Sequence, residues 1–418
     1  MLRYPKKSCV VRPVAWPTSP AEMSVTLLHE IEDCPLKWAL EHASYPEIWD
    51  KHGYPMRMPL ASLLGIVSHS CIEKIIRELV KAGCSSIYSD SAVAVMRSLG
   101  GYTEIIRSCI DGVIVSFQEN PRAEHAIDSL RLSLESHASD IRSRVQLLLG
   151  RVHLDHEKGA TNESLTGASH VKQQAILSPA IYSEVELHAH ELHWRGRVDL
   201  LRLHESSYEL IDFKTGNYSE RHEFQMRVYA LLWLKDSILN PMSRPIDKLT
   251  LSYIREDVQV PVPSLDSLAL LEAEILERTQ DCIKAISISP PKPRLNIERC
   301  AFCGVRHLCE EYWQPQADDS SILRYKDRFI DVEVTLIERH GPLSWNVVIN
   351  AGFSFAVDMP VLLRLPANHF LTHKAKSLDR LRILNAGVIL DAGQMPDSVI
   401  LTINNVSEVY ALESKDEL

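Results

Sequence analysis

The chain has 418 residues, of which 45% are hydrophobic and 24% are charged, an ordinary composition for a globular protein. This length predicts two or three domains, each able to bury its own core. No stretch approaches the roughly 18–20 apolar residues of a membrane span, and the first twenty residues lack the apolar run of a secretory signal. We therefore expect a cytoplasmic protein. The net charge of −10 does not indicate a uniformly basic nucleic-acid binder, although a local basic strip can still bind nucleic acid.

Helical periodicity dominates the first 150 residues. Residues 24–43 predict a helix with a break at Pro35. Residues 60–82 predict a second helix, because apolar side chains recur there at helical spacing. From about residue 85 to 150 the pattern stays mainly helical, which we interpret as a helical insertion over the sheet that follows.

The period changes to two between residues 181 and 214, which predicts three strands. Helices are predicted again over 219–239 and 268–286. Beyond residue 320, five or six short apolar runs separated by Gly, Pro and Asn predict a small barrel or sandwich, and an OB-like barrel is our first choice. The predicted fold class is α/β (α+β): a mixed sheet with helices in a domain over residues 1–315, followed by a small all-β domain over 320–418.

Two carboxylates thirteen positions apart stand near the ends of two predicted strands, Asp199 in Gly-Arg-Val-Asp and Asp212 in Asp-Phe-Lys. Two such carboxylates can hold a hard divalent cation such as Mg²⁺. Lys214 follows Asp212 by two residues, so both side chains point to the same side of the strand. A metal ion, a water molecule and an ammonium group would then meet, an arrangement suited to metal-assisted phosphodiester hydrolysis. Each aspartate alone also fits a strand end that begins a turn, but the combination favours the metal site.

These motifs resemble those of the PD-(D/E)XK nuclease superfamily, and in particular its RecB-like branch. The matching residues follow the order of the family motifs: Gly65 and His69 for G-x-x-x-H, Asp199 for the first aspartate, Asp212-Phe213-Lys214 for D-x-K, and Gln225 and Tyr229 for Q-x-x-x-Y. The resemblance covers roughly residues 24–312. It implies a restriction-endonuclease-like fold.

The resemblance also implies a role for each matching side chain. Mg²⁺ or Mn²⁺ would be held by His69, Asp199, Asp212 and the backbone carbonyl of Phe213. Lys214 would orient or help to deprotonate the attacking water. Gln225 and Tyr229, one helical turn apart, would contact the substrate backbone or brace the active site. By helical position alone, His69 also fits a core histidine, and Tyr229 also fits a residue packed on the sheet. Glu186 is a possible additional carboxylate, with a solvated strand face as the alternative.

Three cysteines form a compact group, Cys300-x-x-Cys303 followed by Cys309. The family variant with an iron–sulphur cluster, as in CRISPR adaptation nucleases and AddB-type helicase-nucleases, implies Cys34 as the distant fourth ligand. Four thiolates suit a [4Fe–4S] cluster or zinc equally, and zinc with His307 in place of Cys34 is a further alternative. The expected role is structural, because the ligands join segments about 265 residues apart.

The segment Arg364–Arg382 is locally basic, and we select Lys374, Lys376, Arg380 and Arg382 as candidate nucleic-acid contacts. A solvated loop and helix face explains this segment equally well.

The motifs and the family resemblance together predict a metal-dependent deoxyribonuclease. The resemblance implies that it acts on single-stranded DNA or DNA ends, in recombination, repair or antiviral defence in a bacterium or archaeon. The alternatives are a non-catalytic nucleic-acid-binding scaffold subunit and a nuclease directed at RNA. The sequence has no P-loop motif, so a helicase or another subunit in trans would supply any motor activity. The last residues, Lys415 to Leu418, spell an endoplasmic-reticulum retention signal, which we interpret as coincidental because no secretory signal precedes it.

Overall fold

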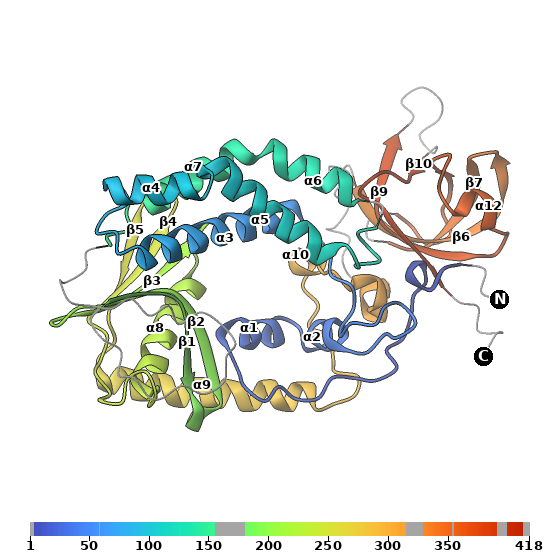
Figure 1. Cartoon of the computed structure of the whole chain (residues 1–418). Helices are drawn as coiled ribbons and strands as arrows, with labels where there is room; N and C mark the ends of the chain where they lie inside the picture. Colours follow the sequence, from blue (N-terminus) through green and yellow to red (C-terminus); the bar gives the residue numbers. More distant parts are fainter. Residues whose placement is uncertain are drawn as a thin grey trace. The chain divides into compact units, whose positions relative to one another are not determined.

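A computed structural model of the chain describes residues 4–57, 59–124, 126–154, 180–314, 329–352, 355–390 and 399–412. The chain divides into two units, whose elements are labelled in Figure 1. The sheet unit contains Thr18–Glu32 and Arg57–Ser287, and the barrel unit contains Met1–Pro17, Asp33–Met56 and Ile288–Leu418. The last residues, 413–418, lie outside the described ranges.

The sheet unit is built on a five-stranded mixed sheet in which spatial order follows chain order. Its strands are β1 (Ala180–Ala189), β2 (Trp194–Leu203), β3 (Tyr208–Lys214), β4 (Lys248–Tyr253) and β5 (Asp257–Val260). Strands β3 and β4 are parallel, and the other neighbours are antiparallel. A parallel pair needs a crossover connection, which α8 (Glu220–Lys235) supplies. The predicted mixed sheet is confirmed.

The remaining helices of this unit cover the sheet. They are α1 (Val25–Asp33), α3 (Leu60–Lys81), α4 (Asp90–Ser98), α5 (Gly101–Phe117), α6 (Ile127–Ser136), α7 (Ala138–Leu149), the 3₁₀ turn η2 (His190–Leu192) and α9 (Leu265–Ile286). Buried side chains of α3, α5 and α7 share one core with Leu200, Ile211 and Phe213 of the sheet. Helix α8 packs against β1–β4, and α9 packs against α8. No helix in the described ranges is long and apolar enough to cross a membrane.

The described residues of the barrel unit form six strands, five of which close into a barrel. They are β6 (Phe329–Gly341), β7 (Ser344–Gly352), β8 (Pro360–Arg364), β9 (Arg380–Leu390), β10 (Val399–Thr402) and β11 (Glu408–Leu412). Strand β10 pairs in parallel with β8 and antiparallel with β9, so the order β6-β7-β8-β10-β9 returns to β6. Helix α12 (Leu371–Lys374) lies between β8 and β9 in the chain. The predicted small β-barrel is confirmed, and its five closed strands make it OB-like.

The segments that carry the four predicted cysteine ligands fold with the barrel. They are α2 (Pro35–His42), α10 (Ile297–Cys300), η3 (Arg306–Leu308) and α11 (Glu310–Trp313), and η1 (Lys6–Ser8) belongs to the same unit. Tyr312 and Trp313 share a core with Leu384 of β9 and Tyr410 of β11. The predicted domain boundary at residues 315–320 assigns the cysteine segment to the other domain. In the structure the units divide at Ser287, because this aromatic packing ties the segment to the barrel.

Candidate active site

The two motif aspartates lie on neighbouring antiparallel strands. Leu200 of β2 is opposite Ile211 of the antiparallel strand β3. Asp199, one residue before Leu200, and Asp212, one residue after Ile211, therefore face each other and point to the same side of the sheet. The predicted site residues all line one cavity of about 360 Å³: His69, Asp199, Asp212, Phe213, Lys214, Gln225 and Tyr229. The structure thus brings together residues from α3, β2, β3 and α8.

The carboxylates of this cavity are largely buried. Asp212 is 4% exposed, and its Oδ2 forms an ion pair with Lys214 Nζ at 2.5 Å. Asp199 Oδ2 accepts a hydrogen bond from the Phe213 N–H at 2.6 Å. Burial, and then the charge of Asp212, raise the pKa of Asp199 well above its usual range. Two desolvated carboxylates that repel each other in one cavity are costly without further positive charge, and oxygen ligands of this kind suit Mg²⁺ or Mn²⁺. The donor set therefore fits a divalent metal.

His69 lies beside the first aspartate, with Nδ1 3.9 Å from Asp199 Oδ2. Burial lowers the pKa of His69, opposed by the charge of Asp212 and assisted by that of Lys214. The neutral imidazole is the form that can bind a metal. Gly65 lies one helical turn before His69. A Cβ at position 65 would stand only 3.3 Å from Thr215 Oγ1, so α3 passes close to the turn after β3.

Gln225 and Tyr229 connect to the lysine through a chain of hydrogen bonds. Lys214 Nζ donates to Gln225 Oε1 at 2.7 Å, and Gln225 Nε2 donates to the Tyr229 hydroxyl at 2.6 Å. Burial raises the pKa of Tyr229, so its hydroxyl stays protonated. In this structure the two residues brace Lys214.

Sequence reasoning assigned no role to three residues near the two aspartates. Arg197 and His222 also line the cavity. The carboxylate of Glu184 is ion-paired with Arg197, and burial raises the pKa of Glu184 despite that partner. The side chain of Glu186 is instead 68% exposed, as a solvated strand face requires. Arg197 precedes Asp199 by two residues, so the two side chains point to the same side of β2. This spacing was the signal in the sequence that Arg197 lines the same cavity as Asp199.

Comparison with known proteins agrees with this geometry. Residues 22–310 match the PD-(D/E)XK nuclease superfamily. The chain belongs to this superfamily. No curated protein matches the chain. Among solved structures, one described as "Crystal structure of SSO0001" is similar at 17% identity, covering 60% of this chain and 98% of that chain, with a TM-score of 0.21. That score is too low to establish a shared fold.

In this PD-(D/E)XK protein the four predicted cysteine ligands all lie in the barrel unit and accept main-chain N–H groups. Cys34 Sγ caps α2 by accepting from Lys37 N at 3.4 Å and also accepts from Arg294 N at 3.5 Å. Cys300 Sγ accepts from Asn296 N at 3.5 Å.

The other two thiols are half-buried. Burial raises the pKa of Cys303 to about 11 and that of Cys309 to about 12, each opposed by a backbone N–H donor, from Val305 and Tyr312 respectively. N–H donors to sulphur stabilise the thiolate form that metals and clusters require.

His307, the alternative zinc ligand, is buried between aromatic rings. Its Nε2 lies 2.7 Å from the Tyr54 hydroxyl, and its ring stacks on Tyr410 with 3.8 Å between centroids. The Tyr54 hydroxyl thus occupies the Nε2 atom of His307 in this structure.

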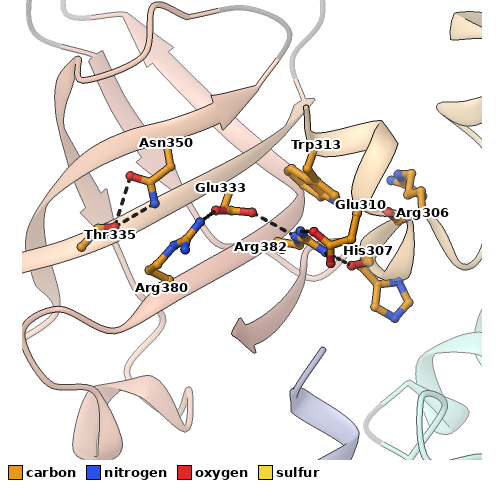
Figure 2. A network of polar contacts seen from close by, with 9 residues as sticks. All are labelled: Arg306, His307, Glu310, Trp313, Glu333, Thr335, Asn350, Arg380 and Arg382. Carbon is orange, nitrogen blue, oxygen red and sulfur yellow. Dashed lines mark hydrogen bonds and ion pairs between the residues drawn. The ribbon is translucent and has the colours of Figure 1, made fainter. Parts of the chain in front are cut away.

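The four candidate nucleic-acid contacts differ in exposure. Lys374 and Lys376 are exposed. Figure 2 shows that Arg380 and Arg382 both contact Glu333. Arg382 is 2% exposed and also donates to the His307 carbonyl at 2.7 Å and to Glu310 at 2.7 Å. Its guanidinium therefore connects the barrel to the cysteine segment and offers no surface to a ligand.

Proposed function

We propose that this protein is a metal-dependent deoxyribonuclease that hydrolyses phosphodiester bonds in single-stranded DNA or at DNA ends. Recombination, repair or defence against foreign DNA would be its setting, and a helicase or other subunit in trans would supply any motor activity. The observation that carries the proposal is the desolvated pair Asp199 and Asp212 beside Lys214 in one cavity of a PD-(D/E)XK protein.

The residues of the cavity divide the chemical work. Asp199, Asp212, the Phe213 carbonyl and His69 would hold Mg²⁺ or Mn²⁺. When bound, the cation would supply positive charge to the phosphate and acidify a water molecule. Lys214, held between Asp212 and Gln225, has donors to orient that water or to stabilise charge on the phosphate oxygens.

Variants at Asp212 and Lys214 test this function. Asp212→Asn and Lys214→Ala should each lower the rate of cleavage of end-labelled single-stranded DNA in Mg²⁺ or Mn²⁺ by about 10²–10⁴-fold. Lys81→Ala, at an exposed lysine that ends α3, is the control. Unchanged cleavage by both active-site variants overturns the proposal. Binding that survives EDTA without cleavage in any metal would instead support a scaffold, and digestion of RNA in parallel identifies an RNA-directed enzyme.

We also propose that Cys34, Cys300, Cys303 and Cys309 hold a [4Fe–4S] cluster with a structural role. The N–H donors to these sulphurs support it. Anaerobically purified protein should then be brown and contain iron, and Cys300→Ser should lose both colour and iron. Cys282→Ser, at a buried cysteine of the sheet unit, is the matched control. Colourless protein with stoichiometric zinc would favour the zinc alternative.

A further inference from the structure

Three side chains of types that bind metals meet at the end of the β1–β2 hairpin, and none of them lines the cavity of the candidate active site. His188 lies near the end of β1, His190 begins η2, and Glu22 precedes α1. Their ligand atoms all lie within 4.8 Å of one another. All three belong to the sheet unit.

The backbone holds these residues in place without help from a ligand. Next to Glu22, Met23 N donates to the His193 carbonyl at 2.8 Å, and Arg195 N donates to the Met23 carbonyl at 2.9 Å. The N–H of His188 donates to the carboxylate of buried Asp236 at 2.9 Å. These hydrogen bonds fix the backbone on which the three ligand side chains stand. The binding of a metal ion would therefore cost little conformational entropy.

The His188 ring is the observation that points to a ligand. Its Nδ1 is buried, makes no hydrogen bond in the described structure, and lies 3.6 Å from Glu22 Oε1. Its Nε2 faces Glu186, with 3.8 Å to Oε2. Metal-binding imidazoles characteristically present one nitrogen to the ion and the other to a carboxylate. The ring of His190 stacks beside it, with 5.3 Å between centroids and 13° between planes.

We propose that Glu22, His188 and His190 form a second metal site, which binds a divalent transition-metal ion such as Zn²⁺. Two imidazoles and one carboxylate suit Zn²⁺ and its neighbours in the first transition series, whereas Mg²⁺ and Ca²⁺ prefer oxygen alone. His190 is exposed, so solvent can complete the coordination.

One cation competes for the carboxylate. Arg195 Nε lies 3.8 Å from Glu22 Oε2, whereas His188 faces Oε1, so the two partners use different oxygens. The Arg195 side chain is 61% exposed and can turn to solvent when the ion binds. The ion would link the segment before α1 to the hairpin. It would thereby close the long loop between Glu22 and His188 and stabilise the sheet unit.

Zinc titration of the chelator-treated full chain tests the site. Wild-type protein should bind one more equivalent of Zn²⁺ than the double variant His188→Ala/His190→Ala, as measured by calorimetry and by metal analysis after dialysis. The catalytic cavity and the cysteines are unchanged in this pair, so their zinc cancels in the difference. The control is His193→Asn, in the same turn but outside the group, because asparagine tolerates the left-handed backbone there (φ 53°).

Two milder variants keep the test decisive if the double variant folds poorly. Glu22→Gln, which is nearly isosteric, and Glu186→Gln, which removes the outer carboxylate, should each weaken Zn²⁺ binding by at least roughly tenfold. Zn²⁺ should raise the Tm of wild type and His193→Asn more than that of Glu22→Gln. Equal zinc stoichiometry, affinity and Tm shift in wild type and all three site variants would overturn the proposal, whatever the outcome for nuclease activity.

Discussion

Gly196 lies directly against Tyr229: a Cβ at position 196 would stand 2.6 Å from the tyrosine Cε1. The glycine of the Gly-Arg-Val-Asp motif is therefore needed for α8 to approach β2. Through Tyr229 it also sets the position of Gln225, and hence of the Lys214 ammonium group. A backbone requirement on one strand thus supports the side chain proposed to act in catalysis.

Gly196→Ala should displace the Tyr229 ring and loosen the brace on Lys214. We expect kcat on single-stranded DNA to fall on the order of 100-fold, because displacements of about 1 Å at a catalytic group have effects of this size. Gly112→Ala is the control, since a Cβ there contacts nothing within 4 Å. A Gly196→Ala enzyme with wild-type kcat would show that the brace is dispensable.

The hydrogen bonds of this brace should act as a unit. Gln225→Leu removes the acceptor of the Lys214 ammonium group, and hydrogen bonds to charged groups are worth about 1.5–3 kcal/mol, or roughly 10–100-fold in kcat. Tyr229→Phe should have a smaller effect, and the double variant should lose little more than Gln225→Leu alone. Steady-state kinetics of the three variants measure the coupling, and fully additive losses would argue against a shared network.

The sequence was informative where a local rule determines geometry. Strand periodicity and short spacing correctly predicted that Lys214 shares a side with Asp212, and helical spacing grouped Gln225 with Tyr229. The place of Glu184 beside Arg197 was not predictable from the sequence. It depends on an unusual positive φ of 54° at Glu184 and on an ion pair across the hairpin.

The barrel unit shows the limit of reasoning from local composition. Arg380 and Arg382 share one face of β9 by periodicity, yet one is exposed and the other is buried. The difference arises because residues 307–313 cover that face at Arg382 only. The same tertiary packing places the unit boundary at Ser287. The proline-rich stretch Pro290–Pro293 just beyond it was the signal available in the sequence.

Arg382 should therefore contribute to stability far more than Arg380. Arg382→Ala leaves buried Glu333 with a single partner, and breaking a buried ion pair costs about 3–5 kcal/mol of unfolding free energy. Arg380→Ala removes a guanidinium whose side chain is 57% exposed and should cost at most about 1 kcal/mol. Thermal and urea unfolding of the two variants provide the comparison. Similar losses of unfolding free energy in both variants would contradict the prediction that the buried Arg382–Glu333 pair stabilises the fold more than the exposed Arg380.

The exposed lysines of the predicted basic segment should affect DNA binding and not stability. If Lys374 and Lys376 contact phosphates, replacing both with Ala should weaken binding of single-stranded DNA. It should also reduce the slope of log K against log salt by about 1.4, at about 0.7 per contact. Lys81→Ala/Lys284→Ala removes two exposed lysines elsewhere and serves as the charge-matched control. An equal change of slope in both double variants would indicate a general charge effect.

His369 should make the barrel unit sensitive to acid. Burial lowers the pKa of His369 from 6.5 to about 4, and its Nδ1 accepts a hydrogen bond from Leu371 N at 3.4 Å, which only the neutral ring can do. Because the folded state disfavours the proton, the stabilisation is complete above pH 6.5 and decreases as the pH falls toward 4. After allowance for partial exposure, we expect a loss on the order of 1–2 kcal/mol. His369→Gln should flatten the dependence of Tm on pH over this interval relative to wild type. Parallel curves for the two proteins would exclude His369 as the titrating group.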